Sequence, residues 1–204
     1  MSATTADIAG GKAQAAAQAR RIAAPVVGMV IFVIAEAMFF GALVSAYLVT
    51  SAQAEAWPPP DLPTLPLGIS AFNAVVLLAS GLFIAIAGQT EQRKEKIQHR
   101  KFFAAGLVLG ACFILFQGGE WVRMLREGFF FDSGPYASFF YLILGAHGIH
   151  VCGALAYLGF IFARGPTRNN AGREVFRSGR VLWYFVVGLW PVLYALVYLY
   201  PGLT

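Results

Sequence analysis

Long apolar runs dominate the chain, and each is long enough for a helix that crosses a membrane. Such a helix needs about 20 mostly apolar residues to cross roughly 30 Å of hydrocarbon. Charged residues or Pro and Gly separate five runs of this kind: residues 25–50, 68–88, 102–122, 136–163 and 181–200. Strands of a transmembrane barrel would be about ten residues long and would alternate in polarity, which these runs do not. The pattern therefore predicts an all-α integral membrane protein, a bundle of five transmembrane helices.

The first 24 residues differ from the rest of the chain. They are rich in Ala, Gln and Thr, and they lack a short apolar core with a cleavage site after it, so they are not typical of a signal peptide. We expect residues 1–24 to form a polar cytoplasmic tail and residues 25–204 to form a single five-helix membrane domain. The sequence shows no internal repeat that would indicate a second domain.

Composition and charge support this interpretation and add an orientation. The chain has 58% hydrophobic and only 12% charged residues, whereas a soluble domain has about 25% charged residues. Of its 15 Lys and Arg residues, all but Arg123 and Arg126 lie in the tail, between the second and third runs, or between the fourth and fifth. Because cytoplasmic loops carry the excess of Lys and Arg, we expect the N-terminus inside and the C-terminus outside. The net charge of +5 thus indicates topology and does not indicate nucleic-acid binding.

Ionisable side chains within the apolar runs are functional candidates, because each costs about 3 kcal/mol or more at the bilayer centre. Glu36 lies eleven residues after Pro25, roughly 16 Å along a helix and near the midplane. His147 and His150 reach a similar depth in the fourth run, and their spacing places them on one helix face. Glu120 lies nearer the outer end of the third run. The candidates for lipid binding or a proton-linked role are Glu36, Phe40, Glu120, His147 and His150.

The same polar residues are also typical of packing between membrane helices, which use polar side chains for hydrogen bonds from helix to helix. In the third run, Gly106, Gly110, Phe113, Gln117 and Glu120 succeed one another at spacings of three and four, which places them on one side. Interhelix polar packing is accordingly the alternative role for Asn73, Ser80, Gln117, Glu120, His147 and His150.

Small and aromatic residues predict further contacts. Small residues let membrane helices approach closely, and we expect close approach at Gly41–Ser45, Gly106–Gly110 and Gly145–Gly148. Aromatic residues gather at membrane interfaces, and we expect Trp57 and residues 129–131 (Phe-Phe-Phe) at the outer one.

A metal site is a further interpretation, since histidines and carboxylates are metal ligands. His147 and His150 lie one turn apart on one helix, so they cannot approach a haem iron from opposite faces. The chain has three histidines, and a haem-copper catalytic centre needs more. We therefore expect no catalytic residue, no cofactor-binding residue and no metal ligand in this chain.

Several segments, taken in order, resemble subunit III of haem-copper respiratory oxidases (the cytochrome c oxidase subunit 3 family) in its short five-helix bacterial form. Residues 35–40 (Ala-Glu-Ala-Met-Phe-Phe) resemble the family's Ser-Glu-x-x-Phe-Phe segment, and residues 57–60 its outer-loop Trp-Pro-Pro. Residues 117–121 resemble a Gln-x-x-Glu-aromatic helix end. Residues 145–151 (Gly-Ala-His-Gly-Ile-His-Val) resemble Gly-x-His-Gly-x-His-Val, the most specific of these motifs.

The last apolar run departs from the family pattern. The family commonly has Trp-His-Phe-Val-Asp-x-x-Trp there, and this chain has Trp-Tyr-Phe-Val-Val-Gly-Leu-Trp at residues 183–190. Tyr184 therefore stands at the His position and Val187 at the Asp position.

The resemblance implies a non-catalytic subunit of a respiratory complex that reduces oxygen to water and pumps protons. Haem and copper are then expected in partner subunits, while this chain stabilises the catalytic subunit, binds phospholipid and supports proton uptake. The glutamate that matches Glu36 is a carboxyl-modification site near bound lipid in similar proteins. The implied partners are subunit I as the main contact, subunit II, a small subunit IV, a respiratory supercomplex and phospholipids, with no nucleic acid. The implied location is the bacterial cytoplasmic (inner) membrane.

The sequence leaves three alternatives open. The chain could be subunit III of a quinol oxidase, an accessory membrane subunit of a nitric oxide reductase, or a free-standing small transporter. A transporter would predict inverted repeats or broken helices around a midplane site, and the sequence shows neither.

Overall fold

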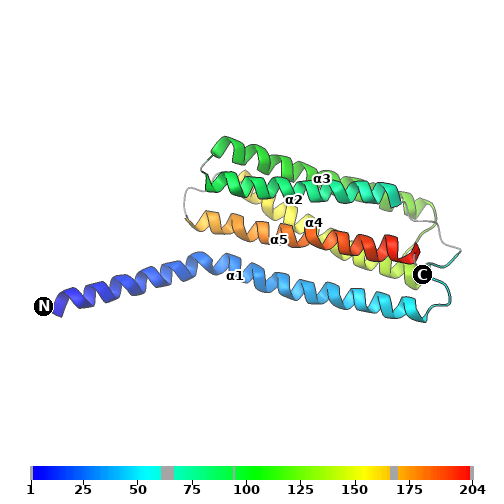
Figure 1. The fold of residues 1–204 in the computed structure, drawn as a ribbon, viewed down its shortest axis with the longest axis horizontal. Helices are drawn as coiled ribbons and strands as arrows, with labels where there is room; N and C mark the ends of the chain where they lie inside the picture. The colour runs from blue at the N-terminus through cyan, green and yellow to red at the C-terminus, as the bar shows by residue number, and fades with distance from the viewer. Residues whose placement is uncertain (1, 61–66, 94, 166–169, 203–204) are drawn as a thin grey trace.

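The computed structural model describes residues 2–60, 67–93, 95–165 and 170–202, and it is helical almost throughout. Five α-helices succeed one another: α1 (Ser2–Gln53), α2 (Leu67–Gln92), α3 (Lys96–Arg126), α4 (Pro135–Ala163) and α5 (Asn170–Tyr194). A π-helical turn, η1 (Ala195–Leu199), and a short 3₁₀ turn, η2 (Tyr200–Gly202), continue α5. The helices run roughly parallel to one long axis, up and down in chain order (Figure 1). All five contain a stretch long and apolar enough to cross a membrane, which confirms the predicted fold class.

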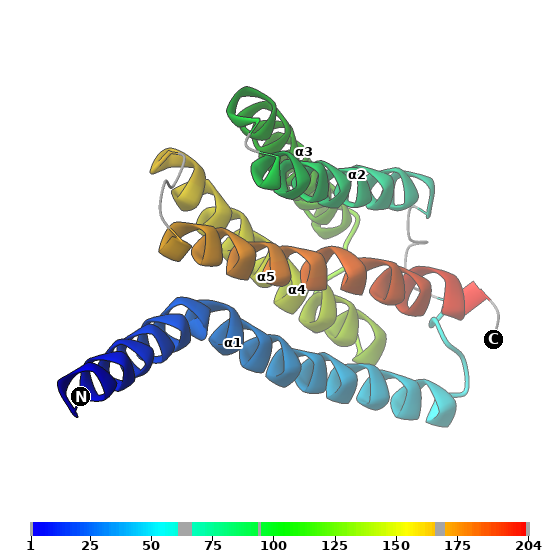
Figure 2. The same ribbon diagram turned by 60° about the vertical axis from the view of Figure 1, so that its left-hand side comes forward.

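The helices α2 to α5 form the body of the bundle, and α1 lies along its side (Figures 1 and 2). The helix α5 is central, because it contacts α1, α2 and α4, while α3 packs on α2 and α4. By contrast, α1 makes substantial contact with only two other helices, α4 and α5. The helix α1 bends, and its part before the bend extends beyond the bundle (Figure 1). Pro25 lies inside this helix, and proline is a common cause of helix kinks.

Three helices begin well before the apolar pattern predicts. The first is α1, which begins at Ser2 instead of near residue 25 and so includes the expected tail. The helix α3 begins at Lys96 instead of near residue 102, and α5 begins at Asn170 instead of near residue 181. Lys and Arg are good helix formers, and their long stems let the charge reach water from a helix end, so a charged segment can extend a membrane helix. The cations expected in loops between the runs are consequently on helices: Lys96, Arg100, Lys101, Arg173, Arg177 and Arg180. Lys94 and Arg168 lie outside the described residues.

Close helix approach occurs at Gly106–Gly110 and in part at Gly145–Gly148, where a Cβ atom on Gly145 would lie 3.4 Å from Trp121 of α3. A Cβ atom on Gly106 would lie 2.7 Å from Ile84, and one on Gly110 would lie 2.7 Å from Trp183, so these positions accept only glycine without rearrangement. The prediction was wrong for Gly41 and Gly148, which have nothing within 4 Å of such an atom. Gly41 is exposed and Gly148 is half-buried without a close neighbour, which sequence spacing alone does not reveal.

The outer aromatic segment is only partly at the surface. Phe130 and Phe131 are exposed, as expected for an interface. The expectation was wrong for Phe129, which is 0% exposed. Its backbone N–H donates to Met124 O, which folds the segment back under the bundle, and its ring packs edge-on against Phe140.

Candidate functional site

The acidic candidate of α1 meets a histidine of α4 inside the membrane-spanning region. Glu36 Oε2 lies 2.8 Å from His150 Nε2. Their side chains are 19% and 18% exposed, respectively, so the pair lies at the edge of the α1–α4 contact and is reachable from outside the chain. Glu36 and His150 thus form a pair that connects α1 to the body of the bundle.

The hydrogen bonds of this pair fix its proton content. His150 Nδ1 lies 2.7 Å from Ala146 O, and because a carbonyl oxygen only accepts, Nδ1 must carry a hydrogen. The short contact between Nε2 and the Glu36 carboxyl then needs one proton. That proton belongs either to an imidazolium that donates to a carboxylate or to a carboxylic acid that donates to a neutral imidazole. In both arrangements a single proton lies between the two side chains, which are partly exposed.

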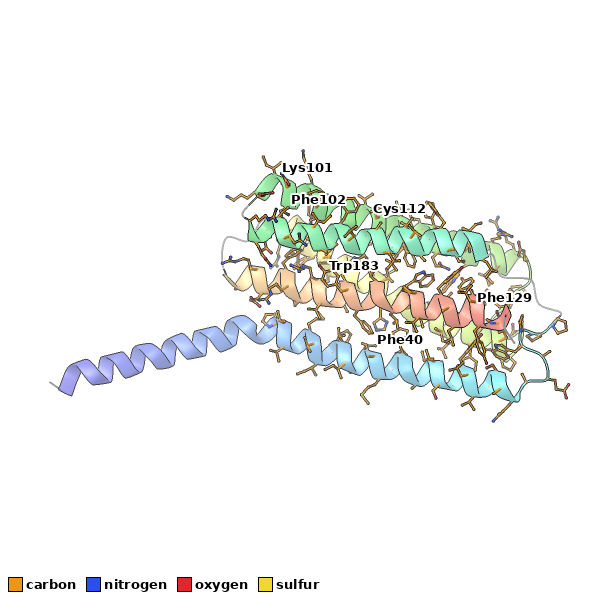
Figure 3. The ribbon with its side chains drawn as sticks, viewed as in Figure 1. Phe40, Lys101, Phe102, Cys112, Phe129 and Trp183 are labelled. Atoms are coloured by element: carbon orange, nitrogen blue, oxygen red, sulfur yellow. The ribbon has the colours of Figure 1, made fainter. Side chains whose placement is uncertain are left out.

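Phe40 lies against both candidate histidines. It comes one turn after Glu36 on α1, it is 1% exposed, and Figure 3 shows it between α1 and the body of the bundle. Its ring meets His150 at 5.4 Å and His147 at 6.4 Å between centroids, both edge-on. Phe40 thus packs α1 against α4 next to the Glu36–His150 pair.

His147 faces the interior of the bundle and does not join the Glu36–His150 pair. Its ring is 1% exposed and lies 5.1 Å from the Trp190 ring with a 30° tilt, and Phe113 contacts it edge-on. Neither ring nitrogen has a hydrogen-bond partner among the described residues. The two histidines of the motif therefore have different surroundings. His150 is partly exposed and has polar partners, whereas His147 is buried among aromatic rings.

The remaining polar candidates connect α2 to α3 at successive levels. Asn73 Nδ2 donates to Gln117 Oε1 at 3.0 Å, and Ser80 Oγ donates to the backbone oxygen of Gly106 at 2.6 Å. Glu120 Oε2 accepts from Ser70 Oγ at 3.0 Å. All of these side chains are buried. Glu120 therefore belongs to the α2–α3 contact and is separate from the Glu36–His150 pair.

Three further buried residues, one on α2 and two on α1, could have been predicted from helical spacing. Ser70 precedes Asn73 by three residues on α2, a spacing that places both on one face. Tyr47 and Ser51 come seven and eleven residues after Phe40, which continues the buried face of α1. Tyr47 accepts a hydrogen bond from Trp57 Nε1 at 2.9 Å. Helical spacing from Asn73 and Phe40 would have found all three.

The possible metal ligands of the described residues do not cluster. Within the ranges that the structure describes, no three His, Cys, Asp or Glu side chains lie together as a metal-binding group. His99, the third histidine, lies in α3, where its Nδ1 is 2.8 Å from Ala87 O. The histidine positions thus serve helix contacts in three separate places.

Comparison with known proteins agrees with the motifs. The family profile described as cytochrome c oxidase subunit III matches residues 6–202. The chain belongs to the cytochrome c oxidase subunit III family. It is 31% identical to the cytochrome c oxidase subunit 3 of Thermostichus vulcanus over 85% of this chain and 86% of that protein. It is 30% and 31% identical to the probable cytochrome c oxidase subunit 3 proteins of Nocardia farcinica and Mycobacterium leprae, over 84% of this chain and 86% of each relative.

Family membership and the five apolar helices together make this subunit III chain a multi-pass membrane protein. The two residues that depart from the family pattern lie in different surroundings on α5. Tyr184 is 37% exposed, and its hydroxyl accepts from Arg180 Nε at 3.2 Å. Val187 is 7% exposed, and its methyl group lies 2.9 Å from where a Cβ atom on Gly81 would be. In this chain Val187, at the position where the family commonly has Asp, therefore makes an apolar contact between α5 and α2.

Proposed function

We propose that this chain is the non-catalytic subunit III of a cytochrome c oxidase that reduces oxygen to water and pumps protons. The family match over residues 6–202 carries the proposal, and the names of the relatives favour a cytochrome c oxidase over a quinol oxidase or a nitric oxide reductase. Haem and copper belong to partner subunits in this proposal. The main contact is subunit I, and subunit II, a small subunit IV and a respiratory supercomplex complete the assembly.

The proposed location is the bacterial cytoplasmic membrane, with the N-terminus inside. The distribution of charge along the bundle supports this orientation. Arg123 and Arg126 lie at the end of α3 that is near the α3–α4 connection, whereas Lys96, Arg100 and Lys101 begin the same helix at the opposite end. Because the cytoplasmic side carries the excess of Lys and Arg, the end where α3 and α5 begin faces the cytoplasm.

The part played by this chain is to support the catalytic subunit through a surface on α1. Large apolar residues are exposed along this helix, among them Ile31, Met38 and Val49. In a membrane such residues face either acyl chains or another subunit. The Glu36–His150 pair is partly exposed beside this surface. We propose that phospholipid binds to the α1 surface. We also propose that the pair holds a proton that takes part in proton uptake by the complex.

Affinity purification of the full chain from its native membrane in a mild detergent tests the assignment. We expect a single band on a blue-native gel that contains haem, copper and the catalytic subunit, and that oxidises reduced cytochrome c. Haem bound in stoichiometric amount to this chain alone would contradict the proposal. A partner that contains haem but no copper would point to a nitric oxide reductase, and oxidation of quinol without cytochrome c would point to a quinol oxidase.

A further inference from the structure

A cavity of about 1050 Å³ lies at the end of the bundle where α3 and α5 begin. Its walls come from the end of α2, the first turns of α3, the end of α4 and the first turns of α5. Lys101 and Phe102 mark this end of the molecule in Figure 3. No described residue of α1 lines the cavity, so it is separate from the surface at Glu36 and His150. Its volume is that of a small-molecule site, for which several hundred to about 1,000 Å³ is common.

The lining is apolar on its inner side. Phe103, Ile161 and Phe176 line the cavity and are themselves buried, and Phe162 lies beside them. These residues come from three helices and form a continuous apolar wall where the membrane-spanning part of the bundle begins. A ligand that fills the whole cavity therefore places an apolar part against this wall.

The opening of the cavity is cationic. Lys96, Arg100 and Lys101 line it and are exposed, and the Arg100 guanidinium lies 5.5 Å from the centre of the Phe162 ring. Glu91 and Glu95 line the cavity too. Among the described residues neither carboxylate forms an ion pair with these three cations. The cations at the opening are therefore available to an anion from outside.

The start of α3 adds backbone donors to the same opening. Glu95 is the N-cap residue of α3, and its side chain makes no capping hydrogen bond. The first backbone N–H groups of a helix have no partner inside the helix, and together they favour an anion. Glu95, Lys96 and Ile97 all line the cavity. Backbone donors and side-chain cations thus converge on one opening above an apolar wall.

We propose that this cavity binds the phosphate group of an anionic phospholipid, with the acyl chains against the phenylalanine wall. A phosphate group accounts for the cations and the uncapped helix start, and acyl chains account for the apolar wall. Phosphate alone would leave that wall without a ligand. Basic pockets between membrane helices on the cytoplasmic side are typical sites for anionic headgroups. This inference does not rest on the catalytic partner, and it concerns a different site from the lipid surface on α1.

Lipid retention by the whole complex tests the inference. The variant is Arg100→Gln with Lys101→Gln, and the matched control is Arg123→Gln with Arg126→Gln, two cations removed from the other end of the same helix. Each complex is delipidated in detergent and titrated with phosphatidylglycerol or phosphatidylcholine, and bound lipid is counted by native mass spectrometry. We expect the cavity variant to bind phosphatidylglycerol roughly twentyfold more weakly, since one cation near a membrane surface contributes about fivefold. The control should bind as the unchanged complex does.

Three results would overturn the inference. Equal weakening in the cavity variant and the control would show a general effect of net charge. Equal binding of phosphatidylcholine and phosphatidylglycerol would remove the anionic headgroup as the ligand. Displacement of the lipid by millimolar inorganic phosphate would assign the opening to a soluble phosphate. A charge-preserving variant, Arg100→Lys with Lys101→Arg, should retain the lipid, and loss of the lipid from an assembled complex of that variant would also contradict the inference. A failed cytochrome c oxidation test would leave these lipid results unaffected, so the two proposals fail independently.

Discussion

Glu36 Oε2 and His150 Nε2 lie 2.8 Å apart, and in the part of the chain that the structure describes they are the one pair of ionisable side chains at ion-pair distance that connects two helices. The other two pairs join neighbouring turns of the same segment. The contact also joins α1, the least buried of the five membrane-spanning helices, to the bundle. A polar bond at this place can therefore affect both how α1 packs on the bundle and how a proton is held beside the proposed lipid surface.

Replacing Glu36 by Gln separates these two roles. The Gln amide can still donate to His150 Nε2, so the hydrogen bond to α1 remains and the stability of the complex should change by less than about 1 kcal/mol. The carboxyl that shares the proton is lost. We expect normal assembly on a blue-native gel, together with lower lipid retention or a shorter lifetime during turnover. Glu55→Gln, in the exposed segment after α1, is the control, and unchanged lipid content and lifetime would leave the pair with a packing role only.

His147 should behave as a packing residue. His147→Ala removes a ring that Trp190 and Phe113 enclose, and the cavity left behind should lower the free energy of unfolding by about 2–4 kcal/mol. His147→Phe keeps a ring in place and removes two ring nitrogens that lack partners among the described residues, so it should cost less. Thermal unfolding of the purified complex measures both. Metal analysis should show the same haem and copper content in both variants, and a specific loss of metal would contradict the packing role.

The helix pattern could be predicted from the sequence because membrane helices need long apolar runs. The equal depth of Glu36 and His150 is also accessible from the sequence, since it depends only on the rise per residue of two helices. The contact between them is not, because it requires α1 to lie beside α4. That choice depends on the fit of side chains such as Phe40 and Tyr47, which are separated from their partners by about a hundred residues.

Other features could not be predicted for a different reason. The helix starts at Lys96 and Asn170 lie in charged segments where hydropathy carries no signal. The burial of Phe129 depends on how the segment between α3 and α4 folds back, which an aromatic run alone does not reveal. The cavity above Phe103 and Phe176 arises from four helix ends, so no single segment indicates it.

Gly110 tests the close approach between helices. A Cβ atom there would lie 2.7 Å from Trp183 Cη2 and 3.0 Å from Leu155 Cδ1. Because the Trp183 ring is fully buried, it has little room to move, and Gly110→Ala should lower the free energy of unfolding by about 1–3 kcal/mol. Gly118→Ala on the same helix is the control, since nothing lies within 4 Å of its added atom. Equal stability of the two variants in thermal unfolding would show that α5 does not pack on Gly110 in this way.

The departure from the family pattern in α5 provides the last test. Val187→Asp restores the family residue at a position that is covered by Gly81 of α2. Val187 is buried, and an unpaired carboxyl placed there should cost several kcal/mol. We expect a large loss of assembled complex on a blue-native gel. Tyr184→His, at the half-exposed position one turn earlier, should assemble normally, and the double variant should not recover assembly because the two side chains face different surroundings. Recovery in the double variant would instead show that the two positions act together, as a pair restored from the family pattern.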